Sequence, residues 1–201
     1  MAIKTFTAGE ILTAADTNTY LANSGLVYVA GASFSGITNA APLDINSVFS
    51  ATYTNYVLVL RVSQTVSNAS FLSRMRTVST LESGSVYQHA WGGGYVGAGP
   101  VFNWAGFSYS VPASPDNYWY MGISPAANNN ANLVLNILSP QAALPTRFTG
   151  QAFTYYQGTY TNVALNGGGS VETNTQYTGI RLYPSAGTTS GEYAIYGYRI
   201  A

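Results

Sequence analysis

The chain has 201 residues, of which 47% are hydrophobic and only 7% are Asp, Glu, Lys or Arg, so it can bury a sizeable core. Seven basic and seven acidic residues cancel, and Lys4 is the single lysine, which argues against nucleic acid as a partner. The absence of cysteine excludes disulfides and thiolate zinc sites.

The low charge also bears on assembly. An average soluble protein carries roughly 25% charged residues, and a soluble monomer usually uses charge to stay dispersed. We therefore expect much of the surface to be covered by copies of the chain or by neighbours. A surface solvated by Ser, Thr, Asn and Gly is the alternative.

Residues 1–25 are expected to form an assembly or attachment segment with one short helix. Thr13 can cap the helix N-terminus, Asp16 lies where an acid favours that end, and Gly25 suits a left-handed terminator. At about three turns the helix is too short to be stable alone. It must therefore dock on its own domain or on another subunit.

The opening sequence MAIKTFTAGE lacks the apolar core of a signal peptide. No stretch reaches the roughly 20 apolar residues that span a bilayer. Neither Sec export nor membrane insertion is expected.

Residues 26–201 are expected to form one all-β domain, and Asn55–Val62 is its clearest strand. The even-numbered side chains from Tyr56 to Val62 are all apolar and must be buried. The odd-numbered ones from Val57 to Arg61 are expected to be partly covered and then to reach solvent or a partner. We expect residues 70–78 (SFLSRMRTV) to be the hairpin partner of this strand.

Further strands are expected along the rest of the domain. They are Leu26–Ala30, Ala32–Ile37, Ile45–Phe49, Ser85–Trp91, Phe107–Val111, Asn117–Ile123, Asn132–Leu138, Phe148–Tyr156, Thr159–Leu165, Gln176–Leu182 and Glu192–Ile200. The glycine-rich stretches Gly92–Pro100 (GGGYVGAGP) and 166–170 (NGGGS) are expected to be irregular or turns. Short strands at this spacing, with no helices between them, indicate a sandwich or barrel of about nine strands.

The segment Phe6–Asn18 (FTAGEILTAADTN) resembles a leader common in tailed-bacteriophage virion proteins. In those proteins an aromatic residue, a Gly, an aliphatic-Leu-Thr-Ala stretch and an Asp-x-Asn precede a short helix and then β structure. The rest of the chain is similar to the jelly-roll-like β-sandwich of small phage tail, fibre and head-decoration proteins. Those chains typically have a strand like Asn55–Val62 and end on one resembling Tyr193–Ile200.

This resemblance implies a non-enzymatic structural protein of the virion, most naturally a tail or fibre adaptor or tip. It implies assembly through residues 1–25 into a homotrimer or larger ring with other virion proteins. The virion would assemble in the host cytoplasm and be released by lysis. The residues expected to carry assembly are Phe6, Ile11, Leu12, Tyr20 and Leu21. The alternatives are a capsid decoration or cement protein and a carbohydrate-binding receptor-recognition module.

Aromatic residues are the most suggestive surface feature, because seventeen tyrosines and three tryptophans exceed what a small core needs. Aromatic side chains beside Asn, Gln and Gly suit sugar rings or a protein interface. The residues expected to form such a binding surface, for example for a host glycan, are Trp91, Tyr95, Trp104 and Trp119. For the aromatic residues as a group, core and subunit packing is the first interpretation, and a protein interface and glycan contact are the alternatives.

No pattern in the sequence predicts catalysis, a metal or a cofactor. His89 is the only histidine and is interpreted as an ordinary strand or loop residue, because no carboxylate lies near it in sequence. The candidate carboxylates for a glycosidase-like pair are Asp44, Glu82, Asp116, Glu172 and Glu192; all but Glu192 lie in apparent turns, and none belongs to a recognisable active-site pattern. The glycine-rich GGGYVGAG lacks the lysine and following helix of a phosphate cradle.

Overall fold

Two antiparallel β-sheets form the part of the protein that the structure describes. This computed structural model describes residues 7, 9–11, 13, 25–67, 69–97, 102–103, 116–123, 127–155 and 160–198. The twelve strands in these ranges are β1 (Val27–Ile37), β2 (Leu43–Ile45), β3 (Asn55–Gln64), β4 (Phe71–Arg76), β5 (Tyr87–Gly97), β6 (Phe102–Asn103), β7 (Trp119–Tyr120), β8 (Asn130–Leu138), β9 (Thr146–Thr154), β10 (Tyr160–Val171), β11 (Gly179–Pro184) and β12 (Thr189–Tyr198). The all-β prediction is confirmed for these residues. The predicted helix after Thr13 and the predicted strand Phe107–Val111 lie outside them.

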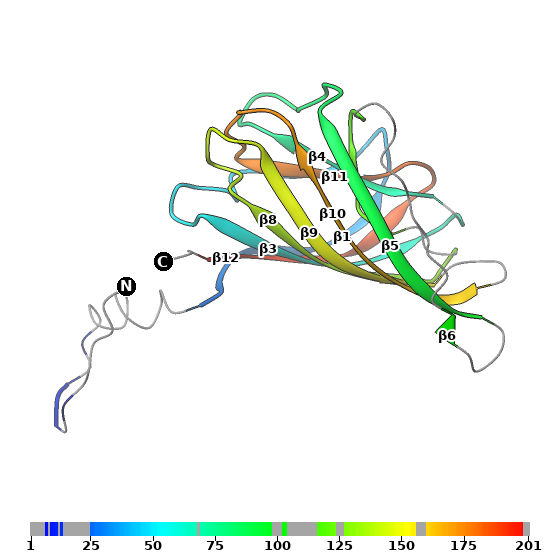
Figure 1. Ribbon diagram of the computed structural model, residues 1–201, viewed down its shortest axis with the longest axis horizontal. Helices are drawn as coiled ribbons and strands as arrows, with labels where there is room; N and C mark the ends of the chain where they lie inside the picture. The colour runs from blue at the N-terminus through cyan, green and yellow to red at the C-terminus, as the bar shows by residue number, and fades with distance from the viewer. Residues whose placement is uncertain are drawn as a thin grey trace.

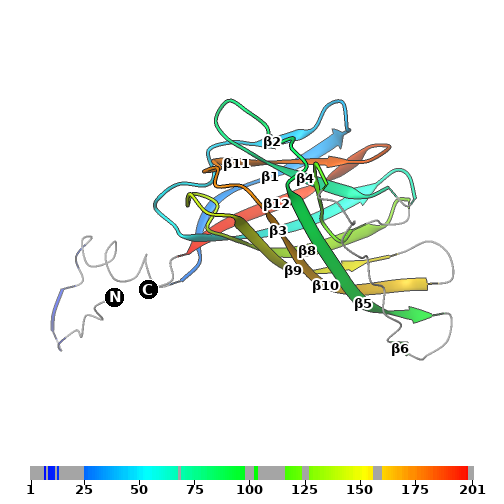
Figure 2. The ribbon, with the colours of Figure 1, turned by 45° about the horizontal axis from the view of Figure 1, so that its top comes forward.

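Eight strands form a large sheet in the order β1-β12-β3-β8-β9-β10-β5-β6, and four form a small sheet in the order β2-β11-β4-β7. In Figures 1 and 2, β1 and β12 lie side by side, and the large sheet continues through β9, β10 and β5 to the short strand β6. Inward-facing residues of both sheets belong to one hydrophobic cluster. The sheets therefore share a single core.

The strand β3 lies inside the large sheet, between β12 and β8. Its side chains Tyr56, Leu58, Leu60 and Val62 are buried, as the alternating pattern predicts. On the opposite face Val59 is partly exposed, and the side chain of Arg61 is exposed. The prediction of one buried and one outward face is confirmed.

The predicted hairpin between β3 and residues 70–78 is wrong, because β4 belongs to the small sheet and pairs with β11 and β7. The connection after β3 crosses between the layers beside the connection from β11 to β12. The Thr65 amide donates to the Thr188 carbonyl, and the Ser185 amide donates to the Ser70 carbonyl. This arrangement lets the apolar sides of β3 and β4 line the same core from opposite sheets.

The two glycine-rich segments that were predicted to be irregular form a ladder. β5 continues through Gly97, and β10 spans the NGGGS sequence, so residues 87–97 pair with 160–171. The glycines are needed here for close approach of neighbouring groups. A Cβ atom at Gly93 would collide with the Ala164 carbonyl, and one at Gly169 with the Gln88 carbonyl. The pairing lengthens two strands that the sequence predicts, Ser85–Trp91 and Thr159–Leu165, by carrying them on through the glycines.

The beginning of β5 joins the two layers. Tyr87 and Asp116 exchange backbone hydrogen bonds of 3.0 and 2.9 Å just before β7. The Tyr87 hydroxyl accepts a hydrogen bond from the Met75 amide at 2.8 Å and donates to the Glu82 carbonyl at 3.2 Å. Burial raises the pKa of the Tyr87 phenol. These contacts close one side of the core.

Candidate functional site

The single histidine lies in a core of aromatic rings. His89 is on β5, its side chain is buried, and its ring lies 6.4 Å from the Tyr118 ring and 6.1 Å from the Tyr120 ring. Its Nε2 is 3.9 Å from a carboxylate oxygen of Asp116. Burial lowers the pKa of His89, opposed by the Asp116 charge, so the neutral form predominates at pH 7. A buried neutral imidazole fits the interpretation as an ordinary strand histidine.

Three of the candidate carboxylates each meet a different partner. The contacts are Glu82 with the Tyr177 hydroxyl, Glu172 with Arg147 and Ser170, and Glu192 with Arg61. Hydrogen bonds from Ser170 and then from Arg147 hold the pKa of Glu172 below its ordinary value. Within the described ranges, no group of three or more His, Asp or Glu side chains could hold a metal ion.

The fourth, Asp44, lies in an arginine cluster on the outer face of the small sheet. Arg181 donates two hydrogen bonds to its carboxylate, at 2.6 and 2.7 Å, and Arg76 lies 2.5 Å away. These contacts, that with Arg181 first, lower the pKa of Asp44. Arg74 lies 5.7 Å from the ring centre of Tyr183. Arg74 and Arg76 lie two residues apart in one strand, but the register of β11 is needed to bring Arg181 beside them.

Two tryptophans that were predicted to form a binding surface are instead part of the core. Trp91 is 2% exposed and Trp119 is 0% exposed. The Trp91 indole donates a 2.8 Å hydrogen bond to the Tyr120 carbonyl, and Trp119 stacks on Phe148 with ring centres 4.5 Å apart. Both point into the space between the sheets, so neither offers an exposed aromatic face.

Glycines make room for these indoles. A Cβ atom at Gly122 or Gly167 would fall within 2.7 Å of the Trp91 ring. Tryptophan and glycine near each other in the sequence were interpreted as part of a binding surface. In the structure the glycines instead leave space for a buried indole ring. The other two predicted surface residues are Tyr95, whose side chain is outside the described part of the chain, and Trp104, which lies outside the described residues.

Of the five predicted assembly residues, only Ile11 lies within the described part of the chain. Phe6, Leu12, Tyr20 and Leu21 lie outside the described residues, whereas Ile11 is 81% exposed. In the single chain Ile11 is therefore almost uncovered.

The outer face of the large sheet carries the other candidate site. Residues paired on neighbouring antiparallel strands point to the same face, so the outward side chains of β1, β12, β3 and β8 form rows. Three successive rows are Tyr28, Tyr196, Val57 and Asn136; then Gly31, Ala194, Val59 and Val134; then Ser33, Glu192, Arg61 and Asn132. The middle row is small and apolar, whereas the rows on either side contain larger or polar side chains.

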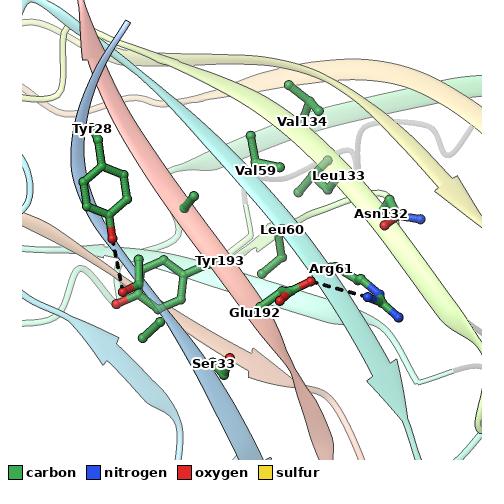
Figure 3. Close-up of a pocket in the computed structure, with 13 residues that line it drawn as sticks. Tyr28, Ser33, Val59, Leu60, Arg61, Asn132, Leu133, Val134, Glu192 and Tyr193 are labelled. Carbon is green, nitrogen blue, oxygen red and sulfur yellow. Dashed lines mark hydrogen bonds and ion pairs between the residues drawn. The ribbon is translucent and has the colours of Figure 1, made fainter.

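A hollow of about 520 Å³ lies over the middle row. Figure 3 shows Tyr28, Val59, Val134 and the Arg61–Glu192 pair among the residues around it. A second hollow of about 260 Å³ continues from Arg61 and Glu192 towards Asn130 and Ser190. We call the two together the outer groove, lined by the middle row, the Ser33 row, Tyr28, Asn130 and Ser190.

Tyr28 projects beside the outer groove and is 60% exposed. Its hydroxyl donates a long hydrogen bond of 3.4 Å to the Gly31 carbonyl, and its ring packs edge-on against Tyr196 with centres 5.9 Å apart. Burial raises the pKa of the nearby Tyr193 phenol, and the Tyr28 phenol raises this pKa further. Sequence reasoning did not single out Tyr28, because one tyrosine among seventeen carries no signal.

Arg61 and Glu192 form an ion pair of 3.4 Å between neighbouring strands, with 56% and 58% of their side chains exposed. Their signals were present in the sequence: Arg61 is the charge that interrupts the outward face of its strand, and Glu192 is the one candidate carboxylate expected in a strand. The sequence does not show that these two residues lie opposite each other on paired strands.

No protein-family model, curated protein or solved structure matches the chain. In the described part of the chain, no helix is long and apolar enough to cross a membrane.

Proposed function

We propose that this protein is a non-enzymatic structural component of a tailed-phage virion, in a tail or fibre adaptor or tip, that assembles through residues 1–25. The observation that carries the proposal is the resemblance of Phe6–Asn18 to the leader of such proteins. The scarcity of charge supports it, since a protein with permanent neighbours needs little self-repulsion. Ile11 is exposed in the single chain, as expected of an apolar residue that another chain covers on assembly.

We also infer that the fold is a jelly roll with two insertions. The orders β1-β12-β3-β8 and β2-β11-β4-β7 support this, because along these eight strands the chain changes sheet at every step except from β4 to β7, as in a jelly roll made of two Greek keys. In this description β5–β6 and β9–β10 are inserted hairpins that extend the large sheet beyond β8. Jelly rolls are common in viral capsid proteins and lectins, so the topology is compatible with display on a virion.

The proposal is tested by the mass of the purified protein in solution, measured by light scattering with and without residues 1–25. We expect the full chain to be a trimer or larger ring and the truncated chain to be a folded monomer. Circular dichroism and thermal unfolding serve as the control that the β-domain remains folded. A monodisperse monomer in both forms would contradict assembly through this segment.

A further inference from the structure

We propose that the outer groove binds a short, uncharged oligosaccharide. This site differs from the aromatic cluster around Trp91 and Trp119, which is buried. The inference does not depend on the proposed place of the protein in a virion, because it rests on the shape and the side chains of the groove.

The shape is that of a ligand site for a chain molecule. The main hollow of about 520 Å³ falls within the usual range for ligand pockets, and the adjoining one lengthens it to one side. The groove crosses four strands, which spans about 14 Å at the usual strand spacing. It arises because Gly31 and Ala194 are small while Tyr28, Arg61 and Glu192 stand higher beside them. An open, elongated groove fits a short polymer better than a compact cofactor.

The apolar surface of the groove suits the C–H faces of sugar rings. Val59, Val134 and Ala194 give the floor three aliphatic contacts on neighbouring strands. Tyr28 adds an exposed aromatic ring that packs edge-on against Tyr196. A tyrosine side chain has only two χ angles, so it loses little conformational freedom when it packs against a ligand.

The polar side suits hydroxyl groups. Arg61 has five N–H donors, Glu192 is a pure acceptor when ionised, and the Asn132 amide offers both. Their planar, forked ends match pairs of neighbouring hydroxyls. An ion pair as exposed as Arg61–Glu192 contributes little to stability. The unused donors and acceptors of the pair are free to bind a ligand.

Charge and symmetry argue against two other occupants. Arg61 and Glu192 neutralise each other, so the groove does not select an anion; the arginine cluster around Asp44 is the better place for one. A two-fold dimer sets the same patch against itself. Two facing hollows would leave a void between the copies, so the groove is poorly shaped for a two-fold dimer contact.

The test begins with the full-length chain on an array of short uncharged oligosaccharides built from hexoses, deoxyhexoses and N-acetylhexosamines. The affinity for the best-bound glycan is then measured by calorimetry for wild type and variants. Ala194→Phe fills the hollow with an outward aromatic residue, which a strand tolerates well, and is expected to abolish binding. Tyr28→Ala is expected to weaken binding about tenfold, and the neutral pair Arg61→Gln with Glu192→Gln by a similar factor.

Matched controls are available elsewhere in the chain. Arg147→Gln with Glu172→Gln removes another exposed ion pair, and Leu144→Ala removes an exposed apolar side chain in the connection between β8 and β9, outside the groove. Both controls are expected to bind as wild type does, and thermal unfolding checks that every variant is folded. Absence of binding to every glycan on the array would overturn the proposal, as would binding that survives Ala194→Phe. Dissociation of an oligomer by Ala194→Phe would identify the groove instead as a contact between copies, and would also overturn it.

Discussion

The strands β3 and β10 are both flanked by neighbours in the large sheet, yet they contribute to the core in opposite ways. Inward side chains of β3, such as Leu58 and Leu60, fill the space between the sheets. In β10 the inward positions Gly167 and Gly169 leave that space open, and the indoles of Trp91 and Trp119 occupy it. β3 therefore contributes apolar side chains to the core, whereas β10 contributes glycines that leave room for side chains from β5 and β7.

The largest effect that would test this comparison is expected at β3. Leu60→Ala should lower the free energy of unfolding by about 3 kcal/mol, because it removes buried methyl groups and leaves a cavity. Val59→Ala, next to it on the partly exposed face, should cost less than about 1 kcal/mol. Urea unfolding of both variants measures the difference. Equal losses at the two positions would show that β3 does not have one core face.

A smaller effect is expected in β10. Gly167→Ala should lower the free energy of unfolding by about 2 kcal/mol, because its Cβ would press on the Ala90 carbonyl and the Trp91 ring. Gly25→Ala is the matched control, since a Cβ there meets nothing within 4 Å. A Gly167→Ala protein as stable as wild type would mean that the glycines of β10 are not required for packing.

The smallest effect is expected on the free energy of unfolding when the pH is lowered, through His89. The folded pKa of His89 is lowered mainly by burial, so below about pH 6.5 the unfolded chain binds a proton that the folded chain does not. The free energy of unfolding should therefore fall between pH 7 and pH 5, by at most about 1.4 kcal/mol per pH unit. His89→Gln should flatten this slope, and the assignment is clean because the chain has no other histidine. A wild-type protein that becomes more stable on acidification would show that the Asp116 charge outweighs burial.

Much of the β3 half could be predicted, because alternating Tyr, Leu and Val residues reveal both the strand and its faces. The path of the chain could not: whether SFLSRMRTV pairs with β3 or crosses to the other layer depends on contacts near Thr65 and Thr188, far apart in sequence. The ladder of β5 with β10 escaped prediction for a different reason. Glycine is typical of turns, and only the partner strand shows when it marks a close approach instead.

The same limit applies to the candidate sites. A tryptophan beside glycines has the same local sequence whether it lies on a surface or fills a gap in the core, so Trp91 and Trp119 were misplaced. The outer groove draws Tyr28, Arg61, Asn132 and Glu192 from four strands. None of these four residues has a sequence context that indicates a binding site. They come together only through the pairing of the four strands.

The pairing of β1 with β12 has a mechanical consequence. Val27 at the beginning of β1 lies opposite Gly197 near the end of β12, and the ladder runs from there to Ile37 and Thr189. A force that pulls residue 27 away from residue 197 would therefore open the hydrogen bonds one after another, as a zipper opens. A force that slides β1 along β12 would instead load all of these hydrogen bonds at once. The pair should therefore resist sliding better than separation of these two strand ends.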